Sequence, residues 1–294
     1  MENIGLTVVS YGGGQETTYF VVRLLEDAEF REKHIAGDLL IAGSDTGNEH
    51  DHTYSNVQKV RDLCDQHNVP FFWITPELGF HSESWQSLTH QYNKNQSVGS
   101  ARFLQTCTDN LKVKVMDRFV EQYIMDVYDI PGSRKQAYYK FAEKYGKIRL
   151  ILGFSSEEEK RTSNGSKYDP IWKQKNVERY YPLIVDGTTR QDCIDYLESQ
   201  MWIVYPSNCM FCFYQSDQEV LWLYRNYPDR FAEWVYIEEQ KLEKYKGQEK
   251  NFGVFGTGTL VDKLAKAQEK FGHWTDDQLN EYKYSHGHCI KSKY

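Results

Sequence analysis

A run of three glycines near the start of the chain constrains its fold more than any other feature. Gly12, Gly13 and Gly14 follow the short run 6–9 and precede a segment whose apolar residues recur at helical spacing. The run 6–9 is largely β-branched and uncharged, which is typical of a strand buried in a parallel sheet. Glycines let a ligand approach main-chain N–H groups and let the backbone adopt positive φ. We therefore expect a strand, a loop and a helix N-terminus that together favour an anion.

Two familiar nucleotide-binding loops, the P-loop and the dinucleotide-binding loop, begin in this way, and the flanking residues match neither of them fully. A P-loop requires a lysine after its glycines, and no lysine follows here. The dinucleotide fingerprint would place a third glycine at Thr17, so that match is only partial. A tight strand-to-helix turn that binds nothing is the alternative to an anion site.

Length, charge and cysteine content limit the class of protein. The chain has 294 residues, enough for one large or two modest domains, and its net charge of −7 argues against coating of nucleic acid by its whole surface. Neither a membrane-spanning apolar segment nor a signal peptide is evident, so a cytoplasmic protein is expected. The six cysteines are then expected to be reduced and available as metal ligands or nucleophiles.

Strands and helices alternate along the first half of the chain. Strands are expected at 38–43 and 69–75 with a helix at 53–67 between them, and this rhythm predicts an α/β fold, Rossmann-like, with a parallel twisted sheet and helices on both faces. Ligands of such sheets bind beyond the carboxyl ends of the strands. The glycine loop and Asp45-Thr46-Gly47 should therefore share one edge, although a turn stabilised by the Asp and Thr side chains is the alternative for the second loop.

Later segments complete the expected secondary structure. A long loop with limited helix is expected at 79–100, and a polar, mobile insert at 162–175. A strand is expected at 148–154. One helix is expected to follow the segment 102–114 and to end near residue 127. Further helices are expected at 133–145, 191–199, 219–246 with a break near Pro228, 260–271 and 276–284.

Two cysteines near the end of the chain carry the most specific metal signal. Cys209 and Cys212 lie three positions apart in a turn, so their thiolates can share one metal ion or one cluster edge. Such a pair needs further ligands, and Cys289 in the tail is one candidate. Cys64 and Cys193 lie in helical patterns and are expected to be core thiols.

In order and spacing, these motifs resemble the ATP pyrophosphatase superfamily (PP-loop, adenine nucleotide alpha hydrolase-like) and, within it, the phosphoadenosine phosphosulfate (PAPS) reductase family. The usual loop is Ser-Gly-Gly-x-Asp-Ser, and residues 12–17 keep its carboxylate as Glu16 and its last hydroxyl as Thr17. Asp-Thr-Gly follows strand two, as in this family. The resemblance covers roughly residues 6–239.

Two further elements of the family have counterparts here. A Cys-Cys or Cys-Thr element followed by a basic residue is matched by Cys107, Thr108 and Lys112. A Gly-x-x-x-x-Glu-x-x-Arg element is matched by Gly153, Glu158 and Arg161. Arginine suits phosphate or sulfate because its planar fork donates two hydrogen bonds, whereas an exposed ion pair within the Glu/Arg run is the alternative.

The resemblance implies a ligand and a set of site residues. The ligand is ATP or PAPS with Mg²⁺. The implied nucleotide-binding residues are Ser10, Gly12, Gly13, Gly14, Gln15, Thr17, Asp45, Thr46 and Gly47, and the implied catalytic residues are Glu16, Thr17, Lys112 and Arg161.

The resemblance also implies a metal centre. Adenylylsulfate reductases hold a 4Fe-4S cluster with a Cys-Cys pair and a Cys-x-x-Cys pair, and Thr108 replaces one of those cysteines here. Cys107, Cys209 and Cys212 would then be ligands, with Cys289 as the fourth or with one iron left open for a sulfur donor. Zinc held by the same three thiolates and either His288 or Cys289 is the non-redox alternative, and unliganded reduced thiols are the third.

The implied function is an ATP pyrophosphatase-type enzyme that adenylates a nucleic-acid or small-molecule acceptor for sulfur transfer. DNA or tRNA acceptors, a sulfur-donor or redox protein and a homodimer are the partners considered. One alternative is a PAPS or adenylylsulfate reductase that releases sulfite, although residues 287–290 match the family's redox motif poorly. Another is a non-catalytic nucleotide-sensing module. The expected organisation is a nucleotide-binding domain at 1–206 and a mainly helical, cysteine-containing region at 207–294 packed on it.

Overall fold

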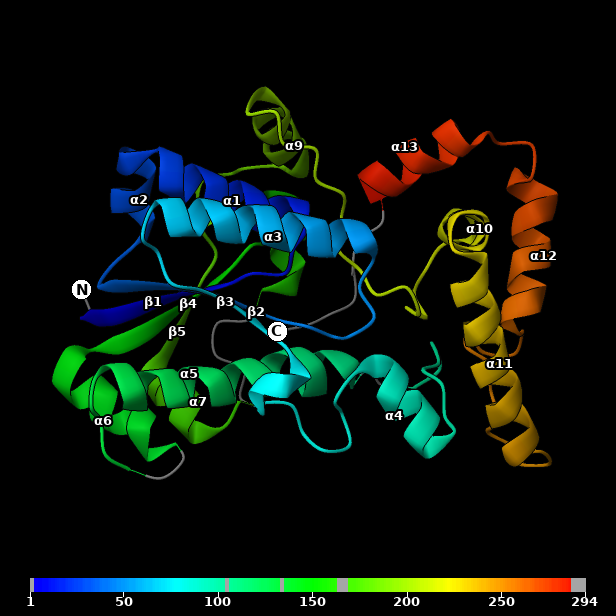
Figure 1. Cartoon of the computed structure of the whole chain (residues 1–294), viewed down its shortest axis with the longest axis horizontal. Coiled ribbons are helices and arrows are strands. Elements are labelled where there is room, and N and C mark those ends of the chain that lie inside the picture. The colour runs from blue at the N-terminus through cyan, green and yellow to red at the C-terminus, as the bar shows by residue number, and fades with distance from the viewer. Residues whose placement is uncertain (1–2, 104–105, 133–134, 163–168, 287–294) are drawn as a thin grey trace.

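A five-stranded parallel sheet forms the centre of the molecule (Figure 1). The computed structural model describes residues 3–103, 106–132, 135–162 and 169–286. The strand order is β3-β2-β1-β4-β5, with bounds β1 Ile4–Ser10, β2 Asp38–Ser44, β3 Phe71–Ile74, β4 Lys147–Leu152 and β5 Val177–Tyr180. All four strand pairings are parallel. The predicted α/β class is confirmed.

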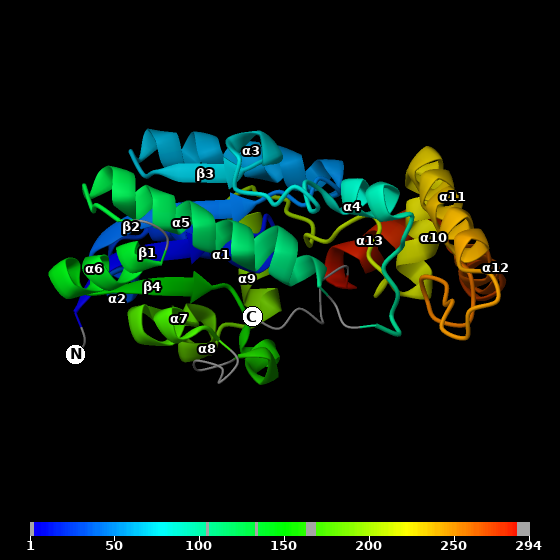
Figure 2. The same cartoon turned by 90° about the horizontal axis from the view of Figure 1, so that it is seen from below.

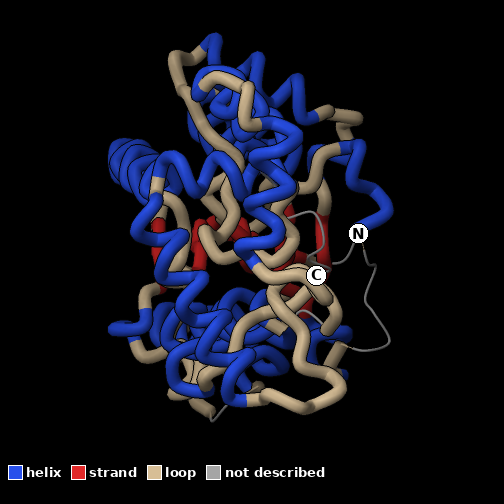
Figure 3. Tube along the Cα trace, turned by 90° about the vertical axis from the view of Figure 1, so that its right-hand side faces the viewer, coloured by secondary structure: helices blue, strands red, loops and turns tan. Residues whose placement is uncertain are grey.

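Helices cover both faces of this sheet, as Figures 1 and 2 show. One face carries α1 (Gln15–Glu26), α2 (Ala28–His34), α3 (Asp51–Gln66) and α9 (Arg190–Ser199). The other face carries α5 (Lys114–Val127), α6 (Gln136–Tyr145) and α7 (Ile171–Asn176). Because side chains of a strand alternate between faces, Val9 joins the core under α1 and α3, whereas Val8 joins the core with α5 and α6. In Figure 3 the strands lie between these helical layers.

A further hydrophobic core lies beyond one end of the sheet. It includes residues of α10 (Asp217–Asn226), α11 (Pro228–Lys244), α12 (Leu260–Phe271) and α13 (Asp276–His286). The break between α10 and α11 falls at Pro228, as predicted. The core also takes in Leu88 and Tyr92 of α4 (Leu88–Asn95) and the 210–213 segment, so residues from both sides of position 206 share it. The boundary at 206 stays a prediction.

Two short elements differ from the expected secondary structure. The polar insert was expected to extend to residue 175, but α7 begins at Ile171, and residues 163–168 lie outside the described part. The strand β5 was missed because its sequence Val-Glu-Arg-Tyr is short, charged and half-buried, as is common at a sheet edge with one neighbour. A short helix, α8 (Pro182–Val185), follows it. Among the described helices, none has both the length and the apolar character needed to cross a membrane.

Candidate functional site

A pocket of about 110 Å³ lies beyond the carboxyl ends of β1 and β4. We call it the glycine-loop pocket. The predicted site residues that line it are Ser10, Gly12, Gly14, Glu16, Thr17, Lys112 and Arg161. Its walls therefore combine the loop after β1, the segment before α5 and the segment after β4. The parallel topology brings these segments together because their strands end at the same edge.

The glycines of the loop have different roles. Gly14 is the N-cap residue of α1, and no side chain caps this helix. The first N–H groups of α1 therefore lack a side-chain acceptor, which makes this N-terminus suitable for an anion. Gly13 has a φ of +74°, and a Cβ there would lie 2.7 Å from Thr53 Cγ2. Gly13 thus serves the packing of the loop on α3 and does not line the pocket.

Five charged side chains line the pocket: Lys112, Arg161, Arg190, Glu16 and Glu158. Arg190 Nε lies 2.6 Å from Glu16 Oε1, and Arg190 Nη2 lies 3.5 Å from Glu158 Oε1. Arg161 also pairs with Glu158. Burial opposes the charge on Arg190, but Glu16 and the neighbouring glutamates together outweigh this effect, so the pKa of Arg190 is raised. The three cationic side chains can bind phosphate if their ion pairs with the carboxylates break.

Arg190 and Ser207 are pocket residues that the sequence reasoning missed. Arg190 is the first residue of α9, which packs on α1, and this contact brings it to Glu16 from 174 positions away. Ser207 lies two positions before Cys209, and a Cβ on Gly14 would lie 2.8 Å from its hydroxyl oxygen. A usable signal for Arg190 was its place at a helix start, directly after the N-cap Thr189.

Four other predicted nucleotide-binding residues lie outside the pocket lining. The side chain of Gln15 is buried and donates to the backbone oxygen of Tyr284 at 3.1 Å. Asp45 accepts hydrogen bonds from the backbone N–H of Gly47 and from the Tyr54 hydroxyl, at 2.8 and 2.9 Å. Burial raises the pKa of Asp45. These contacts are those of a stabilised turn, and Thr46 faces the cysteines instead.

A second, smaller cavity of about 30 Å³ lies beside the first and contains the cysteines. We call it the cysteine cavity. Cys107, Cys209 and Cys212 all line it, together with Thr46 and Lys112. Lys112 lines both the cysteine cavity and the glycine-loop pocket. The fold therefore brings together the three predicted metal ligands that lie within the described residues.

Polar contacts surround the Cys209 thiol. Its Sγ lies 3.3 Å from Thr46 Oγ1 and 3.7 Å from Glu49 Oε1. Lys112 Nζ lies 3.7 Å from the same Glu49 oxygen. Burial, reinforced by the negative charge of Glu49, raises the pKa of Cys209 well above its usual value. In this arrangement the thiol is protonated near neutral pH.

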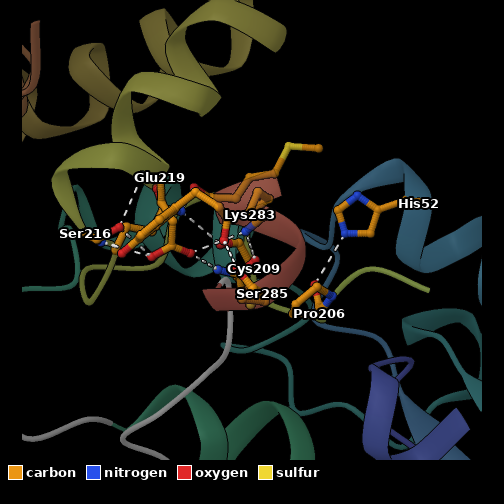
Figure 4. Close-up of polar contacts among 11 residues, drawn as sticks. His52, Pro206, Cys209, Ser216, Glu219, Lys283 and Ser285 are labelled. Carbon is orange, nitrogen blue, oxygen red and sulfur yellow. Dashed lines mark hydrogen bonds and ion pairs between the residues drawn. The ribbon is translucent and has the colours of Figure 1, made fainter. Parts of the chain in front are cut away.

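Backbone and side-chain hydrogen bonds hold the cysteine turn in place. Asn48 accepts from the backbone N–H groups of Met210 and Phe211, at 2.7 and 2.8 Å. Lys283 of α13 is fully buried; its ammonium donates to Asn208 Oδ1 at 2.7 Å and lies 3.4 Å from Glu219 Oε1 (Figure 4). The loop after β2 therefore holds the backbone at Met210 and Phe211, and the last described helix holds the side chain of Asn208.

The side chains around the cysteine cavity are of the kinds that bind metals, but their arrangement is not that of a formed metal site. Three thiols around one cavity are suitable ligands for zinc or iron. Across the described ranges, however, no three His, Cys, Asp or Glu side chains converge closely enough to hold a metal ion. Cys289 and His288, the candidates for the fourth ligand, lie outside the described residues. Metal binding would require the three thiols to draw together.

The two remaining cysteines are core residues. Cys64 and Cys193 are fully buried in the core between the sheet and the helices above it. Burial raises the pKa of Cys64 to about 12. Both thiols therefore behave as the small hydrophobic groups that the helical patterns predicted.

Comparisons with known proteins complete the description. No family model matches this chain, and no curated protein matches it. Among solved structures, it is similar to the U34-tRNA thiolase NcsA from Methanococcus maripaludis with its [4Fe-4S] cluster. The match covers 94% of this chain and 75% of that chain, at 10% identity and a TM-score of 0.43. At this level of similarity, no residue role or activity is transferred from that enzyme to this chain.

Proposed function

We propose that this chain is an ATP pyrophosphatase-type enzyme that binds an adenine nucleotide in the glycine-loop pocket and activates an acceptor for sulfur transfer. The observation that carries the proposal is the pocket itself, where the uncapped N-terminus of α1 meets Lys112, Arg161 and Arg190. A helix N-terminus with three cations is suited to a polyphosphate. The adjoining cysteine cavity, which shares Lys112, connects this pocket to thiol chemistry.

Exchange of partners at Arg190 would prepare the pocket for the nucleotide. Arg190 is paired with Glu16 and Glu158 in the described arrangement. An incoming phosphate offers Arg190 a stronger, bidentate acceptor and releases Glu16. Glu16 and the Thr17 hydroxyl would then be available to Mg²⁺, which prefers oxygen ligands and supplies charge neutralisation at the phosphates.

The proposed reaction begins with attack of an acceptor oxygen on the α-phosphate. The new bond is between that oxygen and phosphorus, and the bond to the β-phosphate breaks, so pyrophosphate leaves and an adenylated acceptor remains. Lys112 and the two arginines stabilise negative charge that develops on the phosphoryl oxygens. A sulfur nucleophile then displaces AMP, which leaves sulfur on the acceptor. DNA, tRNA and small molecules are the acceptors proposed.

The thiols of the cysteine cavity are proposed to bind iron–sulfur or zinc through Cys107, Cys209 and Cys212. Elemental and acid-labile sulfide analysis of anaerobically purified protein tests this separately from nucleotide binding. Absence of metal, together with alkylation of all three thiols in the native state, would contradict it.

Product analysis distinguishes the proposed activity from its alternatives. Protein is incubated with labelled ATP and, separately, with PAPS, and pyrophosphate, AMP and sulfite are measured. Pyrophosphate and AMP from ATP are expected. Sulfite from PAPS would instead support a sulfonucleotide reductase, and nucleotide binding without either product would support a nucleotide-sensing module.

A pair of glycine variants tests where the phosphates bind. Gly12 lines the pocket, and a Cβ there would meet Ser207 Oγ at 3.9 Å and no closer group, so Gly12→Val should fold and lose nucleotide affinity. Gly187 has a φ of +69° and open space around a Cβ, so Gly187→Ala imposes local strain without approaching the pocket. Calorimetry should find binding lost in the first variant and kept in the second. Unchanged affinity in Gly12→Val would refute the site.

A further inference from the structure

A third hollow, of about 150 Å³, adjoins the cysteine cavity. We call it the aromatic chamber. Leu88, Cys107 and Phe213 line both the chamber and the cysteine cavity. None of the residues found to line the chamber lines the glycine-loop pocket, whereas Lys112 joins that pocket to the cysteine cavity. In the described part of the chain, the three hollows therefore follow one another, with the thiols in the middle.

The walls of the chamber favour an uncharged ligand. They include four aromatic side chains, those of Trp85, Tyr92, Phe103 and Phe213. Among the described lining residues there is no Asp, Glu, Lys, Arg or His. A charged group would lose its hydration here without gaining an ionic partner, whereas sulfur makes favourable contacts with aromatic rings.

One hydroxyl in the chamber lacks an acceptor in the described part of the chain. Tyr92 is 3% exposed, and its hydroxyl donates to no acceptor among the described residues, although the backbone N–H of Gly99 approaches its oxygen. The backbone of Gly99 is nearby, and a Cβ there would lie 2.4 Å from this oxygen and from Phe213 Cδ1. A buried hydroxyl without an acceptor loses free energy that a small hydrogen-bonding ligand would restore. The hydroxyl and the Cys107 thiol therefore both point to a ligand in the chamber.

The chamber suits a small ligand. Its volume is enough for a molecule of a few heavy atoms. Its described lining has no cationic side chain for the phosphates of a nucleotide, whereas the glycine-loop pocket has three.

We propose that the aromatic chamber binds a small uncharged thiol, of which hydrogen sulfide is the simplest, and gives it access to Cys107. This inference rests on the proposed function, because it assigns the chamber to the sulfur donor and the glycine-loop pocket to the nucleotide. The donor then reaches the thiols from the side opposite to the phosphates. The charged phosphates and the uncharged sulfur donor thereby occupy separate hollows.

Thiol labelling of the full-length protein, reduced and freed of metal by chelation so that Cys107 is not a ligand, tests the chamber. The probes are methyl methanethiosulfonate, which is small and uncharged, and its sulfonatoethyl and trimethylammonioethyl analogues, which are anionic and cationic. Each forms a mixed disulfide with a cysteine and releases methanesulfinate. The rate at Cys107 is measured by peptide mass spectrometry and divided by the rate in urea-unfolded protein.

The neutral probe should label Cys107 at least about tenfold faster than either charged probe after this correction, because the chamber offers no ionic partner. Ser97→Phe fills the chamber and should slow neutral labelling of Cys107 by a similar factor, whereas Ser55→Phe on the exposed face of α3 should not. Equal corrected rates for all three probes in the wild-type protein would overturn the proposal, and this arm does not depend on the folding of any variant.

Failure of the chamber and failure of the proposed function give different results. ATP binding by calorimetry should be the same in Ser97→Phe and in the wild-type protein. If ATP binds and labelling is insensitive to charge and to Ser97→Phe, the chamber assignment is wrong and the nucleotide site stands. If wild-type protein does not bind ATP, the proposed function is wrong whatever the labelling rates.

Discussion

The glycine-loop pocket and the cysteine cavity lie side by side and share Lys112, but different structural features shape them. The pocket lies at strand ends, and its shape depends on the small residues Gly12 and Gly14. The cavity depends on buried polar contacts that hold the cysteine turn, between Asn48 and its backbone and between Lys283 and Asn208. Changes in the pocket should therefore affect ligand binding, and changes around the cavity should affect stability.

The largest expected effect tests the stability half of this comparison. Lys283→Met removes a buried cation and leaves Glu219 and Asn208 without its hydrogen bonds, so unfolding should become easier by about 3–5 kcal/mol. The exposed pair Lys246–Glu243 provides the control, since Lys246→Met should change stability by less than about 1 kcal/mol. Urea unfolding measures both. Similar losses in the two variants would show that the buried cation does not hold the turn.

The next effect is a pH dependence near the cavity. His52 in α3 has its pKa lowered from 6.5 to about 4, first by burial and then by the charge of Lys283. Its ring stacks on that of His50, whose pKa is also lowered by burial. Between pH 6.5 and 4 the unfolded chain binds more protons than the folded one, so stability should fall as the pH decreases through this window.

For His52 alone, the loss of stability between pH 7 and 4 should approach about 3 kcal/mol. The His52→Gln variant lacks this titration and should show a shallower dependence in the same urea experiment. An identical slope in both proteins would assign the pH effect to other groups, with His50 as the first to examine.

A smaller effect tests the ligand half of the comparison. Lys112→Gln removes a cation from the wall between the two hollows, so nucleotide affinity should fall by about 10- to 100-fold through loss of a charge-assisted contact. Lys114 is two residues further on and pairs with Asp109 on the surface, so Lys114→Gln is the matched control. Calorimetry should separate the two variants. Equal affinities would remove Lys112 from the proposed site.

The smallest effect concerns a residue that the sequence assigned to the nucleotide. Gln15 lies in the loop but donates to Tyr284 of α13 and does not line the pocket. Gln15→Leu should therefore lower the free energy of unfolding by about 1 kcal/mol and leave nucleotide affinity unchanged. Loss of nucleotide affinity without loss of stability would show that Gln15 contributes to nucleotide binding.

The sequence predicted the α/β fold, whereas the role of each site residue stays a prediction. Hydrophobic runs and the glycine loop indicated the parallel sheet because strand and turn preferences are local. Lys112, which the family resemblance implied, lines the glycine-loop pocket. Arg190 was missed because its proximity to Glu16 depends on the packing of α9 against α1. The assignment of Gly13 and Asp45 to the nucleotide stays a prediction, and their contacts within the protein are ones that spacing along a chain does not reveal.

Ser207 gives this arrangement one further consequence. Its hydroxyl lies close to Gly14 at the edge of the glycine-loop pocket, and its backbone is two peptide units from Cys209. Two residues of extended chain span at most about 7 Å, so a ligand that displaces Ser207 beyond the reach of this short segment would also move the thiol. Occupancy of one hollow and geometry of the other are then linked thermodynamically. By reciprocity, a metal that binds the thiols would change the affinity for the nucleotide by some factor. The nucleotide would then change the affinity for that metal by the same factor.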